Sequence, residues 1–231
     1  MNAVLFGDSI TQAGECEEQS RWPVLLRQRL AQRHPKREFA LVNAGVGGNT
    51  SREGLARIER DVLAHHPDVV TVEFGGNDAT PERDRHVDLE EFKKNIEAIC
   101  RQTRASGAVP VLLTFTPIID AWHCFAGDSQ FSEKGGPDAY IEDYREATRA
   151  LARNLGCDLA DIDRALRQAM EKEGQSEFIM PDGVHLTPRG NELVAGELFR
   201  IFWKILVSEE GGHPCSEPEP DATGSITEDH V

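Results

Sequence analysis

Residues 3–9 read AVLFGDS, which is a short apolar run followed at once by glycine, aspartate and serine. An apolar run of this length that ends at a turn residue predicts a buried β-strand. Four further runs of this kind follow along the chain, and helical periodicity separates them. The predicted strands are 3–6, 39–43, 68–74, 109–115 and 157–162.

The segments between these strands carry helix signals. Strands that alternate with helices pair in parallel through right-handed crossovers. We therefore predict a three-layer α/β/α sandwich with about five parallel strands. The predicted helices are 21–33, one capped by Ser51, one that begins near Asp88, 137–154, one that ends near Lys172, and one that begins at Thr187-Pro188.

The length of 231 residues and the hydrophobic content of 39% suit one packed domain. The formal net charge is −15, and residues 209–231 hold seven acidic and no basic side chains, so that −15 becomes −8 without them. We predict a domain over 1–208 and an acidic, disordered tail over 209–231. An acidic surface repels phosphate, so nucleic acid is not an expected partner.

The chain shows no signal peptide pattern and no apolar run long enough to span a membrane. Five cysteines, an odd number without a Cys-x-x-Cys pair, indicate reduced thiols and a cytoplasmic protein. Cys100 falls on the apolar face of a predicted helix, which is typical of a small buried side chain. The cysteines are Cys16, Cys100, Cys124, Cys157 and Cys215.

Reactive residue types follow the predicted strands. Residues 7–9 (GDS), 45–49 (GVGGN) and 75–78 (GGND) come after the first three strands, and 182–185 (DGVH) precedes the last helix. In an open parallel sheet, ligands bind outside the carboxyl ends of the strands. The sequence thus predicts that the first three segments share one edge of the sheet, and that the fourth can reach this edge because it immediately precedes a helix that runs away from it.

Together these segments supply the parts of an acyl-transfer site. Ser9 is a weak nucleophile unless a base accepts its proton, and His185 can be that base. Asp182 can accept the other ring N–H and stabilise the imidazolium. Negative charge on a substrate oxygen needs preorganised donors, which the N–H groups of Ser9 and Gly48 and the Asn77 amide can supply. Asp8 and Asp78 are expected to hold neighbouring loops.

These four blocks, in this order, resemble the signature blocks of the SGNH/GDSL hydrolases over residues 4–190. The resemblance implies a flavodoxin-like sandwich that hydrolyses esters or thioesters of small acyl groups, with no metal or cofactor. It also implies the roles stated above for Ser9, Gly48, Asn77, Asp182 and His185. The first block continues Ile10-Thr11 where the family nickname has Leu, a mild departure. The expected partner is a small-molecule ester.

Other interpretations of the same residues remain open. Ser9 could cap a helix, and His185 could be a surface residue. The glycines at 45–48 could cradle a phosphate, although they follow the second strand and lack the Gly-x-Gly-x-x-Gly spacing. The α/β-hydrolase elbow, Gly-x-Ser-x-Gly, fits less well because Thr11 stands two residues after Ser9. The same site could transfer acyl groups to an alcohol, or belong to an inert binding module.

Residues 118–140 have no clear periodicity and are long for a loop, which favours a lid or pocket wall. Trp122, His123 and Phe125 in this segment are candidates for substrate contacts or for packing within the lid. The sequence does not predict the acyl length or the oligomeric state.

Overall fold

The computed structural model describes residues 1–209. Its five strands form one parallel sheet in the order β2-β1-β3-β4-β5, as predicted for a flavodoxin-like fold. Each predicted strand is present with ends shifted by a few residues. The elements are β1 Asn2–Gly7, α1 Ser9–Gln12, α2 Trp22–Arg33, β2 Ala40–Gly45, α3 Ser51–Asp61, β3 Val69–Glu73, α4 Leu89–Ala105, β4 Val109–Leu113, α5 Ser129–Ser132, α6 Pro137–Leu155, β5 Asp158–Ala160, α7 Ile162–Glu173 and α8 Pro188–Glu209, with single 3-10 turns at Glu18–Ser20, Leu63–His65 and Gln175–Glu177.

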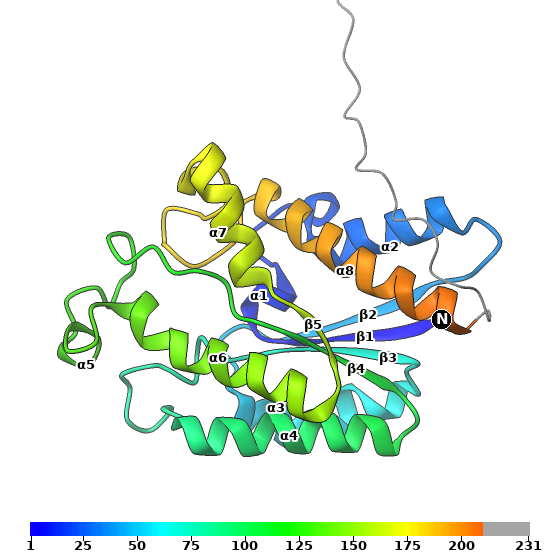
Figure 1. Ribbon diagram of the computed structural model, residues 1–231, viewed down its shortest axis with the longest axis horizontal. Coiled ribbons are helices and arrows are strands. Elements are labelled where there is room, and N and C mark those ends of the chain that lie inside the picture. The colour runs from blue at the N-terminus through cyan, green and yellow to red at the C-terminus, as the bar shows by residue number, and fades with distance from the viewer. Residues whose placement is uncertain (210–231) are drawn as a thin grey trace, which may run out of the picture.

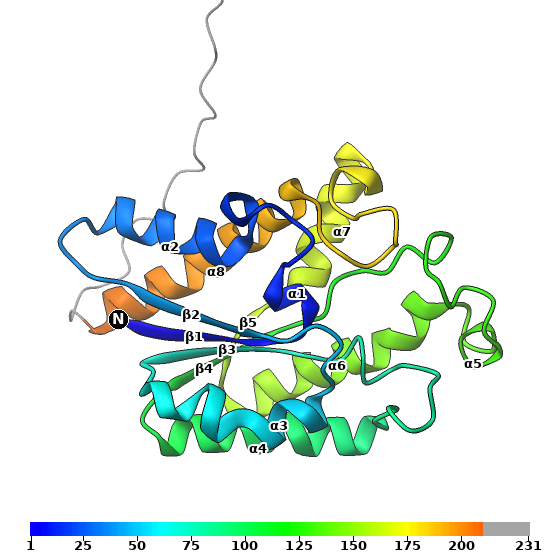
Figure 2. The ribbon, with the colours of Figure 1, turned by 180° about the vertical axis from the view of Figure 1, so that it is seen from behind.

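Helices cover both faces of the sheet. Helices α2, α7 and α8 lie on one face, and α3, α4 and α6 lie on the other (Figures 1 and 2). The central strands β1 and β3 are buried on both faces, which explains why they are continuous apolar runs. Within the described residues, no helix is long and apolar enough to cross a membrane. The predicted tail, apart from Glu209 at the end of α8, lies outside the described residues.

The start of α3 corrects one prediction. Thr50, and not Ser51, is the N-cap: its hydroxyl accepts the N–H of Glu53, and the Glu53 carboxylate accepts the N–H of Thr50 in return. Ser51 is the first helical residue, and both its N–H and its hydroxyl donate to Asp78. Thr50 and Ser51 are both residue types that cap helices, and the reciprocal bond with Glu53 places the cap at Thr50.

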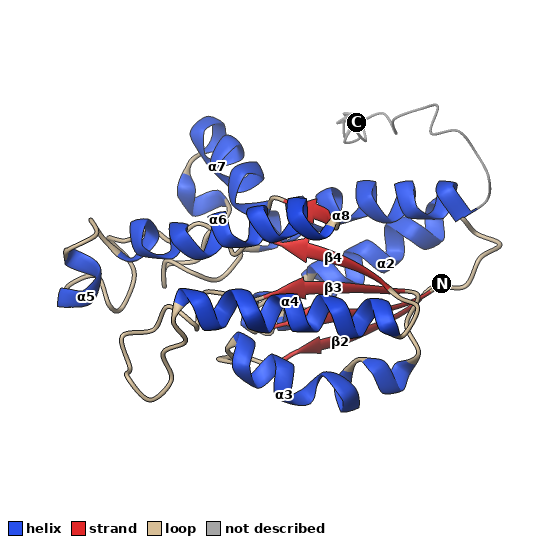
Figure 3. Cartoon of the chain, turned by 60° about the horizontal axis from the view of Figure 1, so that its bottom comes forward, coloured by secondary structure: helices blue, strands red, loops and turns tan. Residues whose placement is uncertain are grey.

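The strand register aligns the segments that carry the candidate site. Gly7 at the end of β1 pairs with Gly45 at the end of β2 and with Glu73 at the end of β3. All strands run in one direction, and their carboxyl ends point to the side of the molecule where α5 lies (Figure 3). The loops after β1, β2 and β3 therefore begin side by side.

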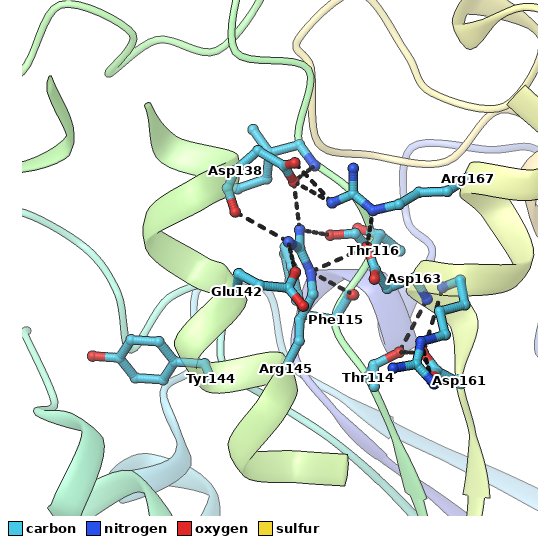
Figure 4. A network of polar contacts seen from close by, with 12 residues as sticks. Thr114, Phe115, Thr116, Asp138, Glu142, Tyr144, Arg145, Asp161, Asp163 and Arg167 are labelled. Atoms are coloured by element: carbon cyan, nitrogen blue, oxygen red, sulfur yellow. Dashed lines mark hydrogen bonds and ion pairs between the residues drawn. The ribbon is translucent and has the colours of Figure 1, made fainter. Parts of the chain in front are cut away.

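A buried ion-pair network fixes the chain that leaves β4 (Figure 4). The Arg145 guanidinium is fully buried and donates to the carbonyls of Phe115 and Thr116 and to the Asp138 carboxylate. Asp138 also accepts the N–H of Ile118. This network holds the beginning of the 118–140 segment against α6. No sequence pattern indicates this network, because Arg145 lies on a helix with many charged side chains.

Candidate active site

The turn after β1 places Ser9 at the first position of α1. The Asp8 side chain caps this helix by accepting the N–H of Ile10 at 2.9 Å. Gly7 is required here, because an added Cβ would collide with the Thr11 hydroxyl and lie 2.7 Å from the carbonyl oxygen of Glu73. The tight turn brings the Ser9 side chain out beyond the sheet edge.

The loop before α8 brings His185 and Asp182 to Ser9. His185 Nε2 lies 3.0 Å from Ser9 Oγ, and His185 Nδ1 lies 2.7 Å from Asp182 Oδ2. With a proton on Nδ1, the ring donates to Asp182 and accepts the Ser9 hydroxyl proton through Nε2. Partial burial acts to raise the pKa of Asp182, but the bond from His185 and two backbone N–H bonds outweigh it and lower this pKa. The carboxylate is therefore held in its charged form.

The backbone of the 182–185 loop is fixed by local and distant contacts. Asp182 Oδ1 accepts the N–H groups of Val184 and His185 at 2.9 and 3.0 Å. Gly183 has a φ of +79°, and an added Cβ would lie 2.7 Å from the carbonyl oxygen of Ile119. The N–H of Ile119 in turn donates to the Gly183 carbonyl at 2.9 Å. The 118–140 segment thus packs directly on the loop that carries Asp182 and His185.

The three predicted oxyanion donors lie around the turn at Ser9. The loop after β2 passes beside it, since a Cβ built on Gly47 would lie 3.8 Å from Ser9 Cβ. Within residues 1–209, the backbone N–H groups of Ser9 and Gly48 have no acceptor. Both hydrogens of the Asn77 amide are engaged, with Asp8 Oδ2 at 3.0 Å and the Asn49 carbonyl at 3.2 Å. To donate to a substrate oxygen, the Asn77 amide would have to give up the longer of these two bonds, the one to the Asn49 carbonyl.

Beneath this turn lies a carboxyl pair that the sequence analysis missed. Asp8 and Glu73 are both buried, and they lie at the carboxyl ends of the adjacent strands β1 and β3. Burial raises the pKa of Asp8 to about 6, and burial together with the charge of Asp8 raises that of Glu73 well above its usual value. Glu73 Oε2 accepts the Thr11 hydroxyl at 3.1 Å, whereas Oε1 has no donor within the described part of the chain. A proton on Glu73 satisfies both observations, and it leaves Asp8 charged to accept from Ile10 and Asn77.

Asp78 holds α3 at the same edge of the sheet. It accepts the Ser51 N–H at 3.0 Å, as well as the Ser51 hydroxyl. Burial raises the pKa of Asp78 to about 7, against the lowering effect of these bonds. Asp78 thus lies in the structural position that we expected for it.

A second carboxylate lies beside the histidine. Glu15 Oε1 is 3.5 Å from His185 Nε2, the nitrogen that faces Ser9. Glu15 and Cys16 line a shallow surface hollow together with Ser9 and His185. No sequence pattern singles out Glu15, because it is one of three acids in a polar loop.

The aromatic candidates in the 118–140 segment occupy different environments. Trp122 is 37% exposed. His123 and Phe125 are half-buried, with ring centroids 5.7 Å apart, and both rings contact Phe131 on α5. Burial lowers the pKa of His123. The structure thus places His123 and Phe125 within the packing of this segment and leaves Trp122 at the surface.

This chain is similar to known proteins over most of its length. Residues 5–193 match the model of the GDSL-like Lipase/Acylhydrolase family. The chain is 30% identical over 231 residues to "Isoamyl acetate-hydrolyzing esterase 1 homolog" of Rattus norvegicus, covering 94% of this chain and 85% of that protein. It is 29% identical over 216 residues to "Uncharacterized lipoprotein YqeF" of Bacillus subtilis, covering 84% of this chain and 86% of that protein.

A solved structure supports the same assignment. The acetyl xylan esterase AlAXEase superposes with a TM-score of 0.71 at 28% identity, covering 89% of this chain and all of that one. The family model spans the turn at Ser9, the loops at Gly48 and Asn77, and the Asp182–His185 loop. The chain therefore belongs to the GDSL-like lipase/acylhydrolase family and is an enzyme of the esterase/acylhydrolase class.

Proposed function

We propose that the protein hydrolyses carboxylic esters of small acyl groups through a Ser9-His185-Asp182 triad and an acyl-enzyme. The observation that carries this proposal is the continuous hydrogen-bonded chain from Ser9 Oγ through His185 to Asp182, with links of 3.0 and 2.7 Å. These links lie within the reach required of a nucleophile, a base and the group that orients the base.

In the first half of the reaction, Ser9 Oγ attacks the acyl carbonyl carbon and its proton passes to His185 Nε2. The imidazolium that forms is stabilised by the Asp182 carboxylate at Nδ1. The carbonyl oxygen becomes an oxyanion, which the Ser9 and Gly48 N–H groups face. Asn77 joins them by giving up its bond to the Asn49 carbonyl.

In the second half, the tetrahedral intermediate collapses, the bond to the alcohol breaks, and His185 returns its proton to the leaving oxygen. Water then attacks the acyl-Ser9 carbonyl, with the same imidazole as base. The second intermediate releases the carboxylic acid and restores the Ser9 hydroxyl. Each step uses the same nitrogen, Nε2, so the leaving alcohol and the attacking water must occupy the same place in turn.

That place determines the class of alcohol that we propose. An oxygen within hydrogen-bonding distance of His185 Nε2 is also close to Glu15, whose carboxylate lies 3.5 Å from the same nitrogen. A leaving alcohol with a neighbouring hydroxyl, such as a sugar, can donate to this carboxylate, and an anionic leaving group is repelled. The names of two relatives, an isoamyl acetate-hydrolyzing esterase homolog and an acetyl xylan esterase, support acetyl esters as the acyl side.

The first experiment compares acetyl-ester hydrolysis by the wild-type protein and Ser9→Ala. Loss of turnover in the variant is expected, and equal activity would reject Ser9 as the nucleophile. A series of p-nitrophenyl esters with increasing acyl length tests the preference for small acyl groups. A flat or rising series would contradict it.

The second experiment tests the role of Glu15. In Glu15→Gln, kcat/KM for an acetylated sugar should fall about fivefold, because an exposed hydrogen bond to a charged group is worth about 1 kcal/mol. Hydrolysis of p-nitrophenyl acetate, whose leaving group has no neighbouring hydroxyl, is the matched control and should change little. An equal fall for both substrates would assign Glu15 to a general electrostatic effect.

Acyl transfer to an alcohol uses the same acyl-enzyme, with the alcohol in place of water. Product analysis in the presence of a competing alcohol separates the two outcomes. We also propose a cytoplasmic location, because all four cysteines in the described residues are free thiols. Cell fractionation tests this part of the proposal.

A further inference from the structure

The segment 45–49, which carries the Gly48 N–H, depends on contacts from elsewhere in the chain for its conformation. Three of its five residues are glycines, Gly45, Gly47 and Gly48, and Gly48 has a φ of +78°. Glycine has more backbone freedom than any other residue type, so this sequence alone does not fix the direction of the Gly48 N–H. Before Gly48, the Gly47 N–H donates to Gln12 Oε1 at 3.2 Å. The part of the segment after that bond needs a hold of its own.

The loop after β3 supplies this hold through two side chains. The Gly48 carbonyl accepts from Arg85 Nη2 at 2.6 Å, and the next carbonyl, that of Asn49, accepts from Asn77 Nδ2 at 3.2 Å. Among the described residues, Arg85 is the one that hydrogen-bonds to Gly48 itself. One loop thus holds two consecutive carbonyls of the segment 45–49.

The position of Arg85 is itself fixed by a turn. Its backbone N–H donates to the Glu82 carbonyl at 2.9 Å, and its Nη1 donates to the Glu82 carboxylate at 3.0 Å. Two residues later the chain is anchored by Val87, which is fully buried and donates its N–H to the Asp78 carbonyl at 3.0 Å. With Nη1 occupied by Glu82, Nη2 is the nitrogen directed at Gly48.

The bond from Arg85 matters most during the reaction. In the proposed mechanism, Asn77 leaves the Asn49 carbonyl in order to donate to the oxyanion. The segment then loses one of its two bonds from the loop after β3, just when the Gly48 N–H has to face the same substrate oxygen. The bond from Arg85 does not have to break in this step, and a hydrogen bond from a charged donor is stronger than one between neutral groups.

We propose that Arg85 is a positioning residue for the oxyanion hole. It holds the Gly48 carbonyl, and thereby keeps the Gly48 N–H directed at the substrate oxygen while Asn77 changes partner. Arg85 does not touch the substrate in this role, because it acts through Gly48. This inference rests on the proposed function and adds a residue to its oxyanion hole.

A surface ion pair is the simplest alternative role for Arg85. The side chains of Arg85 and Glu82 are 44% and 52% exposed, and exposed pairs of this kind contribute little to stability. This alternative predicts that kcat does not change when Arg85 is removed. It does not account for the bond from Nη2 to the Gly48 backbone.

The test measures kcat and KM for p-nitrophenyl acetate with the full-length Arg85→Ala protein. The oxyanion forms only as the reaction proceeds, so a loosened Gly48 N–H should lower kcat and leave KM nearly unchanged. We expect kcat to fall about tenfold, which is less than the fall of about 10²- to 10³-fold for the loss of a whole donor. Arg85→Lys can still place a charged donor on the Gly48 carbonyl and should recover most of the lost kcat. Arg83→Ala is the matched control: Arg83 is exposed in the same loop, has no bonded partner within residues 1–209, and should leave kcat unchanged.

Fluorophosphonate labelling separates a failure of this inference from a failure of the proposed function. The phosphonyl oxygen enters the same hole, so Ser9 of Arg85→Ala should be labelled more slowly than in the wild-type protein but to the same final extent. If the wild-type protein is not labelled on Ser9, the proposed function and this inference both fail. If it is labelled, this inference alone is overturned by an unchanged kcat in Arg85→Ala, by a rise in KM without a fall in kcat, or by a lower final extent of labelling that Arg85→Lys does not restore.

Discussion

Asp182→Asn is the substitution that separates the proposed triad most sharply from a chance arrangement. The asparagine can keep its oxygen toward the N–H groups of Val184 and His185, as Asp182 Oδ1 does at 2.9 and 3.0 Å. Its NH₂ group then faces His185 Nδ1. That nitrogen must become an acceptor, which moves the ring proton to Nε2, where it faces Ser9. The ring can no longer accept the Ser9 proton without first changing its tautomer.

The magnitude of this effect has two limits. Loss of one charge-assisted hydrogen bond of the kind seen at 2.7 Å costs about 2 kcal/mol, or about 30-fold in rate. Holding the histidine of a serine triad in the wrong tautomer costs about 10⁴-fold. The Asp182 side chain is 46% exposed, so solvent screens part of its charge. We expect kcat/KM for an acetyl ester to fall about 10²- to 10³-fold, between these limits.

The assay is initial-rate hydrolysis of p-nitrophenyl acetate by wild-type and variant protein, with thermal unfolding to verify the fold. Asp182→Ala is the companion variant. Alanine presents no NH₂ group to His185 Nδ1, so this variant should lose activity without forcing the ring into the wrong tautomer. Glu15→Gln is the control for charge alone, because Glu15 faces Nε2 at 3.5 Å and not Nδ1. Activity of Asp182→Asn within threefold of wild type would refute the assignment of Asp182 as the orienting acid.

Three further predictions concern the surroundings of the triad. Asn77→Ala should lower kcat by about 10²-fold or more with little change in KM, measured on the same ester, if its amide binds the oxyanion. Burial raises the pKa of Asp8 to about 6, so the folded protein keeps a proton there that the unfolded chain releases; the contribution of Asp8 to the unfolding free energy should therefore be greatest below about pH 4 and fall by about 3 kcal/mol as pH rises past 6. The pKa of Glu73 is also raised, so Glu73→Gln, which removes its titration but can still donate to Asp8, should flatten this fall in urea unfolding at pH 5 and pH 8. Arg145→Ala should lose about 3–5 kcal/mol in the same assay, because it leaves the buried carbonyls of Phe115 and Thr116 without their donor, whereas Arg101→Ala at an exposed pair should stay within about 0.5 kcal/mol of wild type.

Local pattern was sufficient to predict the fold. Each strand is a short apolar run between turn residues, and each helix has a periodic apolar face. Residues that are close together in the sequence are therefore enough to identify each element and the order of the elements. The alternation of strands and helices then restricts the sheet to parallel pairing. Three segments of the candidate site could be placed together because they follow the carboxyl ends of parallel strands, which share an edge. The fourth, 182–185, could be added because it immediately precedes α8.

Features that depend on long-range contact could not be predicted in this way. Glu73 is the last residue of a β-branched strand, and only the register of β1 and β3 places it beneath Asp8. Glu15 reaches His185 through the path of a polar loop. In each case the side chain's neighbour comes from another part of the chain.

Covalent labelling of the nucleophile tests the central claim most directly. The full-length protein is treated with a fluorophosphonate, which reacts with activated serines, and the modified peptide is identified by mass. The account predicts one adduct on Ser9, with loss of ester hydrolysis in proportion to labelling. Ester hydrolysis that continues after Ser9 is fully labelled, or an adduct confined to another residue, would contradict it.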